Sequence, residues 1–139
     1  MGEFFETTVR DPAGHIKIAV GSLAVSRPFY ELLFGALGSE YQQIKDKPNG
    51  AAWVTPHGFG IWIAEAAVQD YPHQHEAPGL HHLCLKAGSR DGVDGLHRVL
   101  VEAGTQIDLP PQSFPQYTND YYAVFFRDPD GIKLEVAHY

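Results

Sequence analysis

The sequence predicts an α+β fold made of two βαβββ modules, because one order of patterns occurs twice along its 139 residues. Each copy begins with a short stretch in which apolar residues alternate with others, as in a half-buried strand. A segment with apolar residues at helical spacing follows, and further strand patterns come after it. The predicted parts are an N-terminal extension, a first module, a linker and a second module, at residues 1–12, 13–66, 67–78 and 79–139.

The first module opens with a strand at residues 15–20, where the apolar residues fall on one side and His15 falls on the other. A helix is predicted in SRPFYELLFGALG, with Ser26 as its N-cap and Pro28 in its first turn. The stretches AAWVTP and GIWIAEA are predicted strands, separated by a turn at His57 and Gly58. These elements account for most of the first module.

The second module repeats this layout from residue 82 to the end of the chain. Its first strand is predicted at residues 82–87, with His82 at the position that His15 has in the first module. A helix is predicted in SRDGVDGLHRVLVEAG, with Gly104 as its C-terminal stop. The strands YYAVFFRD and GIKLEVAH follow, joined by a tight Asp-Pro-Asp-Gly turn at residues 128–131.

The composition excludes several classes of protein. The formal net charge of −7 and the lack of a basic patch argue against a nucleic-acid or anionic-membrane partner. The first residues lack the pattern of a signal peptide, and no apolar stretch has the length needed to cross a bilayer. Cys84 is the one cysteine, so no disulfide framework can form within the chain, and a reducing cytoplasmic location is expected.

Three side chains with metal-binding chemistry are predicted to share one face of the strands. If the apolar faces pack against the helices, then His15, His82 and Glu135 project from the opposite face. Two imidazoles and one carboxylate form a sensible ligand set for a divalent cation, which we expect to be iron, manganese, zinc or nickel. The ordinary alternative for Glu135 is an exposed ion pair with Lys17 or Lys133.

A further carboxylate, Glu65, lies on the last predicted strand of the first module. Aligning GIWIA with GIKLE sets Ala64 against Glu135, so Glu65 falls on the apolar side of its strand. A β-bulge would reverse this orientation. Glu65 is therefore kept as a possible fourth ligand and as a candidate catalytic residue.

Other polar side chains near these positions have open roles. His81 must point away from His82, so we expect it beneath a helix with its ring bonded to backbone, or at the edge of the strand. Cys84 shares the face of His82. Tyr121 and Tyr122 either orient a substrate or pack in the core, and Tyr122 is the candidate catalytic residue. The remaining histidines are interpreted as solvated: His57, His73, His75, His97 and His138.

The stretches GHIKIAV, FYELLFGALG, PGLHHLCLKA and FFRDPDGIKLEVAH resemble the vicinal oxygen chelate superfamily, which includes glyoxalase I, bleomycin-resistance proteins, fosfomycin-resistance enzymes and extradiol dioxygenases. The resemblance implies a U-shaped mixed sheet around a cleft, with the helices on the convex side and a homodimer as the assembly. It also implies that His15, His82 and Glu135 hold the metal. Glyoxalase-like members have a fourth ligand where this chain has Ala64, so a three-ligand site fits more directly.

The resemblance leaves two functions open. The first is a glyoxalase-like or dioxygenase-like metal-dependent enzyme, a lyase, isomerase or dioxygenase, that binds a small bidentate oxygen substrate and stabilises its anionic intermediate. Trp62 would then supply an aromatic wall of the cleft. The alternative is a metal-free protein of the bleomycin-resistance type, which binds and sequesters a small molecule.

Overall fold

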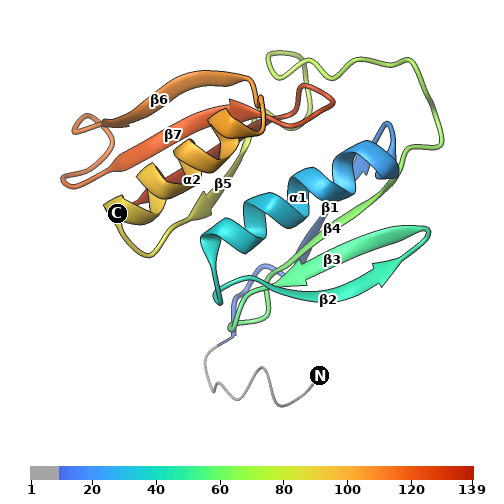
Figure 1. Cartoon of the computed structure of the whole chain (residues 1–139), viewed down its shortest axis with the longest axis horizontal. Coiled ribbons are helices and arrows are strands. Elements are labelled where there is room, and N and C mark those ends of the chain that lie inside the picture. Colours follow the sequence, from blue (N-terminus) through green and yellow to red (C-terminus); the bar gives the residue numbers. More distant parts are fainter. Residues whose placement is uncertain (1–9) are drawn as a thin grey trace. The chain divides into compact units, whose positions relative to one another are not determined.

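The computed structural model describes residues 10–139, which form two compact units divided between Asp70 and Tyr71. Each unit contains a four-stranded mixed sheet and one helix in the order βαβββ (Figure 1). The predicted α+β fold with two βαβββ modules is therefore confirmed. The predicted U shape concerns how the two sheets stand together, and it stays a prediction. Within residues 10–139, neither helix combines the length and the apolar character needed to cross a membrane.

The first unit contains β1 (His15–Val20), α1 (Leu23–Leu37), β2 (Gln42–Lys47), β3 (Gly50–Val54) and β4 (Gly60–Glu65). Its strands lie in the order β1-β4-β3-β2, with β1 parallel to β4 and the other neighbours antiparallel. α1 packs on β3 and β4. The ring of Phe34 on this helix lies 4.8 Å from that of Trp53, which pairs with Ile61 across the sheet. These side chains are buried and form the core of the unit.

The second unit contains β5 (Leu83–Lys86), α2 (Arg90–Glu102), β6 (Ile107–Ser113), β7 (Tyr122–Arg127) and β8 (Lys133–His138). Its strand order, β5-β8-β7-β6, repeats that of the first unit, again with the outer pair β5 and β8 parallel. α2 packs on β6, β7 and β8. Val93, Leu96 and Leu100 of this helix are fully buried, as the helical spacing in the sequence predicts.

α1 begins one turn earlier than the sequence pattern predicts. Its N-cap is Ser22, while Ser26 is fully buried inside the helix and Pro28 lies in the second turn. The prediction of Ser26 as N-cap is therefore wrong. The reason is a distant partner, since the Leu23 N–H donates to Glu65 Oε1 at 3.0 Å and a carboxylate at a helix start is favourable.

Two strands have no strong signature in the sequence. β2 is polar and largely exposed, and β6 contains Pro110 and Pro111. Both strands lie at the edge of their sheets, where a strand can expose polar side chains and can tolerate proline. The position at the edge, rather than their own residues, explains why they are strands.

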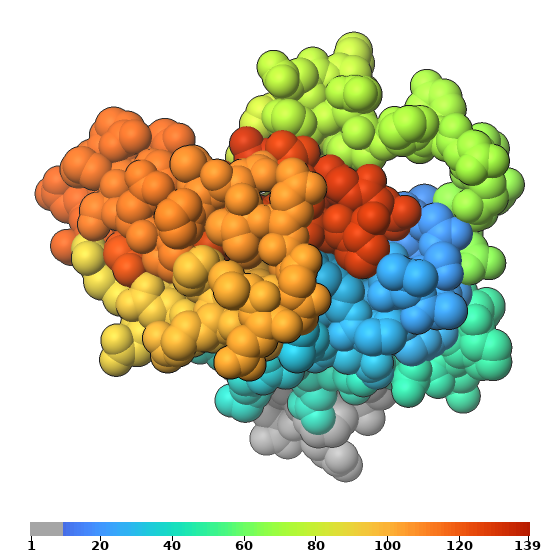
Figure 2. Space-filling view, turned by 45° about the horizontal axis from the view of Figure 1, so that its top comes forward, coloured from blue at the N-terminus to red at the C-terminus, as the bar shows by residue number. Residues whose placement is uncertain are grey.

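The segment between β4 and β5 has no helix or strand and contains the division between the two units. Most of its side chains are exposed, and in Figure 2 it is the yellow-green segment at the surface. The predicted linker at 67–78 lies within it, although its bounds stay a prediction. Residues 1–9 of the predicted N-terminal extension lie outside the described residues.

The turn between β7 and β8 depends on one buried side chain. Asp128 is 5% exposed, and its Oδ1 accepts hydrogen bonds from the Asp130 and Ile132 N–H groups at 2.8 and 2.9 Å. Gly131 has a φ of 81°, a conformation that glycine adopts without strain. The predicted tight turn is confirmed, and it sets the register in which Phe125 pairs with Glu135.

We expect Asp128→Ala to lower the free energy of unfolding by about 1–3 kcal/mol, because two backbone N–H groups lose their acceptor. Asp128→Asn keeps a side-chain oxygen at the same place and is the matched control, with a smaller loss. Urea unfolding followed by circular dichroism measures both. Equal losses in the two variants would contradict this account of the turn.

Candidate functional site

Glu135 is a buried carboxylate on the sheet face that α2 leaves uncovered. Its side chain is 3% exposed, and β8 lies between β5 and β7, so Cys84 and Phe125 are its neighbours on the flanking strands. Leu134 and Val136 precede and follow it and point to the opposite face. The alternation in GIKLEVAH is therefore observed as predicted, but Glu135 is much less exposed than a surface ion pair would be.

Each oxygen of the Glu135 carboxylate has a different partner. His82 Nε2 lies 3.0 Å from Oε1, and the Tyr121 hydroxyl donates a short hydrogen bond to Oε2. Lys133, which we considered as an ion-pair partner, instead has its Nζ over the Phe125 ring. Buried charge requires such polar partners, because an unpaired carboxylate out of water is strongly unfavourable.

These contacts define a direction of hydrogen bonding through both histidines. Since a carboxylate can only accept, His82 Nε2 carries the proton of this contact. In a neutral imidazole the other nitrogen then accepts, and His81 Nδ1 lies 2.7 Å from His82 Nδ1. His81 Nδ1–H is the donor of that bond. A hydrogen-bonded chain thus connects Tyr121, Glu135, His82 and His81.

Aromatic and small side chains enclose the carboxylate. Phe114, Ala123, Phe125 and Ala137 form a buried cluster on its face of the sheet, against which Tyr121 and Cys84 pack. Burial, and then the hydrogen bond to Glu135, raises the pKa of the Tyr121 hydroxyl above its usual value, so this group remains a donor. The environment is one in which charge interactions are only weakly screened by water.

In the first unit, His15 lies on the face of the sheet opposite α1. His15 pairs with Gly60 of β4, and its ring centroid lies 6.3 Å from that of Trp62. A side chain at Gly60 would be tightly packed against both, since a Cβ atom there would be 3.2 Å from His15 Cβ and 3.0 Å from Trp62 Nε1. The predicted common face of His15 and Trp62 is therefore present within this unit.

The two candidate catalytic residues of the sequence have other contacts. Glu65 binds the Leu23 N–H at the start of α1, and β4 has no bulge that would turn it to the other face. The Tyr122 hydroxyl donates to Asp94 Oδ1 of α2 at 2.7 Å, which raises its pKa. Both side chains thus point toward a helix. The tyrosine beside Glu135 is Tyr121, whose proximity the sequence does not reveal.

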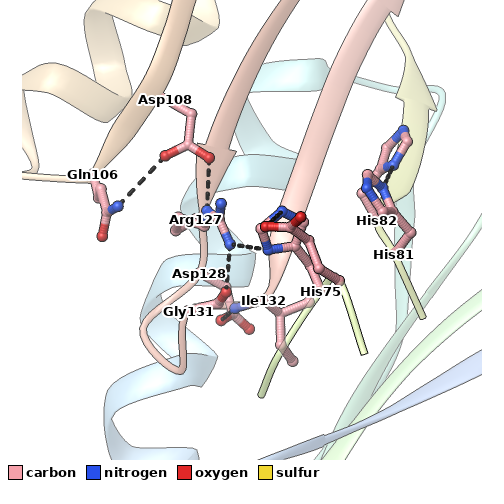
Figure 3. A network of polar contacts seen from close by, with 10 residues as sticks. His75, His81, His82, Gln106, Asp108, Arg127, Asp128, Gly131 and Ile132 are labelled. Atoms are coloured by element: carbon pink, nitrogen blue, oxygen red, sulfur yellow. Dashed lines mark hydrogen bonds and ion pairs between the residues drawn. The ribbon is translucent and has the colours of Figure 1, made fainter. Parts of the chain in front are cut away.

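His75 and His81 differ from their sequence-based interpretations. His81 is exposed beside His82, so the expected place beneath a helix is wrong. Loss of hydration beside its neighbours, and then the charge of His82, lowers the pKa of this imidazole although the side chain is exposed. His75 is only 22% exposed, with Nδ1 3.3 Å from Arg127 Nη1 and its ring 5.1 Å from that of His81, so it is not simply solvated (Figure 3). Arg127 also binds Asp108.

Part of the predicted metal-ligand set is compatible with one cation. Two donors that bind the same ion at about 2.1 Å lie roughly 3.0–3.4 Å apart, and the His82–Glu135 distance of 3.0 Å meets this condition. Within residues 10–139, no group of three or more His, Cys, Asp or Glu side chains is arranged to hold a metal ion. His15 belongs to the other unit, so its convergence with these donors stays a prediction.

The family model of the Glyoxalase/Bleomycin resistance protein/Dioxygenase superfamily matches residues 13–136, so the chain belongs to this superfamily. The resemblance inferred from the sequence is therefore confirmed.

Particular relatives agree with this assignment. The uncharacterized protein YqjT of Bacillus subtilis is 30% identical over 125 residues, which cover 88% of this chain and 95% of the relative. The metallothiol transferase FosB of Lysinibacillus sphaericus is 28% identical over 127 residues, which cover 87% of this chain and 77% of the relative. A glyoxalase/bleomycin resistance protein from Albidiferax ferrireducens has a crystal structure with a TM-score of 0.77 and 24% identity, covering 93% of this chain and 100% of that chain, which supports the fold.

We expect Cys84 to react slowly with thiol reagents. Burial, and then the charge of Glu135, raises the pKa of its thiol to about 12, so on the order of 1,000-fold less thiolate than usual is present at pH 8. The rate of alkylation by iodoacetamide should still rise with pH above pH 10. The protein unfolded in urea, in which the rate levels off near pH 10, is the control. A native rate that levels off in the same range would contradict the raised pKa.

Proposed function

We propose that this chain is a metal-dependent enzyme of its superfamily that binds a small molecule through two adjacent oxygens. The observation that carries this proposal is the buried Glu135 carboxylate in contact with His82. Burial of a carboxylate beside a histidine lowers stability unless it is well compensated, and such sites are often functional. A cleft that binds a small molecule without a metal does not require a buried pair of His82 and Glu135.

His82 and Glu135 are the proposed ligands from the second unit, and His15 is the proposed ligand from the first. In the tautomer of His82 that carries its proton on Nδ1, Nε2 presents a lone pair beside Glu135 Oε1, which gives one nitrogen and one oxygen donor. Three protein ligands leave coordination positions for substrate oxygens. The chemistry supplied by a bound divalent cation is polarisation of these oxygens, which stabilises an anion as it forms.

The surroundings support this function in a second way. The aromatic cluster around Glu135 limits the access of water, so a charge that develops near the carboxylate is weakly screened. The relative FosB is named a metallothiol transferase, which is consistent with metal-dependent chemistry in a chain of similar sequence. We propose iron, manganese, zinc or nickel as the metal, because histidine and carboxylate ligands suit all four.

We expect the purified protein to bind about one divalent metal ion per chain. His15→Ala, His82→Ala and Glu135→Gln should each lower the bound metal strongly, because each removes a donor. His97→Ala, which changes a histidine of α2, is the matched control and should retain the metal. Inductively coupled plasma mass spectrometry after dialysis gives the stoichiometry, and thermal melting verifies that each variant is folded. Lack of metal in every form, after reconstitution, would favour the sequestering function.

We expect a bidentate oxygen ligand to bind to the metal. In protein loaded with Co²⁺, acetohydroxamate should change the visible absorption bands, because its two oxygens can occupy the open coordination positions. Acetamide has a similar size but presents one oxygen, so it should cause little change at the same concentration. Identical responses to the two compounds would argue against two-oxygen binding even if the metal itself is present.

A further inference from the structure

The two oxygens of Glu135 are not equivalent in this structure. Oε1 lies beside His82 Nε2, whereas Oε2 accepts the hydrogen bond of the Tyr121 hydroxyl. A metal ion can compete for the first contact, because His82 binds a metal through Nε2 only in the tautomer that carries the ring proton on Nδ1. The second contact involves no proposed metal ligand other than Glu135, so it can persist when a metal is bound.

We propose that Tyr121 is a positioning residue, which holds Oε2 of Glu135 and thereby presents Oε1 as the single oxygen available to a divalent cation. The proposal rests on the proposed function, since it concerns the same carboxylate. A carboxylate without such a partner rotates easily about its last bond and can bind a metal through both oxygens. Hydrogen bonds to the outer oxygen of a ligand fix its orientation and commonly change metal affinity roughly 10- to 100-fold.

Tyr121 is itself held firmly enough for this role. Its ring stacks on that of Tyr139, with centroids 4.5 Å apart and an angle of 14° between the planes, and it meets the rings of Phe114 and Tyr117 edge-on. Its backbone carbonyl accepts a hydrogen bond from the Phe114 N–H at 2.8 Å. The hydroxyl is therefore placed before any metal binds, and little conformational entropy is lost on binding.

The number of coordination positions that Glu135 occupies on the metal has a functional consequence. A glutamate that binds through one oxygen leaves one more coordination position than a glutamate that binds through two. A substrate that binds through two adjacent oxygens needs two such positions. Tyr121 thus supports substrate binding without contact to the substrate or to the metal.

The test compares Tyr121→Phe with Tyr122→Phe, which remove the same hydroxyl from adjacent residues on opposite faces of the strand. In the Tyr122 variant the lost bond is the one to Asp94 on α2. We expect Tyr121→Phe to bind Co²⁺ at the same stoichiometry, with an affinity roughly 10- to 100-fold lower. The visible absorption of the bound Co²⁺ should be weaker in this variant, because Glu135 can then bind through both oxygens and raise the coordination number. Tyr122→Phe should match the unchanged protein in both measurements.

A second variant tests the support of Tyr121 while its hydroxyl is retained. Tyr139→Leu removes the stacked ring, and we expect a decrease in Co²⁺ affinity that is smaller than that of Tyr121→Phe. Wild-type affinity and spectrum in Tyr121→Phe would overturn the positioning role and leave the proposed function intact. Lack of Co²⁺ binding by the unchanged protein would overturn both. Equal losses in the Tyr121 and Tyr122 variants would show a general loss of structure and would also overturn the role.

Discussion

Burial of the Glu135 carboxylate constrains the side chains around it in the second unit. A charge that is 3% exposed on a central strand needs polar partners from neighbouring elements, and it finds them in His82 before β5 and Tyr121 before β7. The two partners approach Glu135 from opposite sides, because β5 and β7 flank β8. The buried cluster around the carboxylate is otherwise largely apolar and aromatic, which makes the hydrogen bonds stronger and their loss more costly.

Much of the arrangement was predictable from strict alternation along the strands. The pattern in GIKLEVAH separates Glu135 from Leu134 and Val136, and the Asp-Pro-Asp-Gly turn sets β7 against β8 in one register. From these facts the common face of Phe125 and Glu135 follows, and Cys84 shares it through the pairing of β5 with β8. The internal repeat also predicts that the two units have the same strand order, because two similar patterns with the same element order fold in the same way.

The contacts that the sequence could not reveal depend on side-chain reach rather than on alternation. Tyr121 shares a face with Phe125, but it is four residues away, which is roughly 13 Å along an extended strand. Its hydroxyl nevertheless reaches Glu135, and the Tyr121 backbone is held before β7 by hydrogen bonds with Phe114 and Thr118. The start of α1 is a similar case, because it depends on Glu65, which is 42 residues distant in the chain.

The two units show how one scaffold accommodates different chemistry. In the first unit the position that matches Glu135 is Ala64, and its neighbours on the flanking strands are Ala19 and Gly50, so this position places no charge that has to be compensated. The carboxylate of this unit, Glu65, lies one position further and binds the start of α1. A shift of a single residue along a strand thus separates a carboxylate that stabilises a helix from one that faces the opposite side of the sheet. The second unit requires the additional partners, His82 and Tyr121, because Glu135 lies on that face and is buried there.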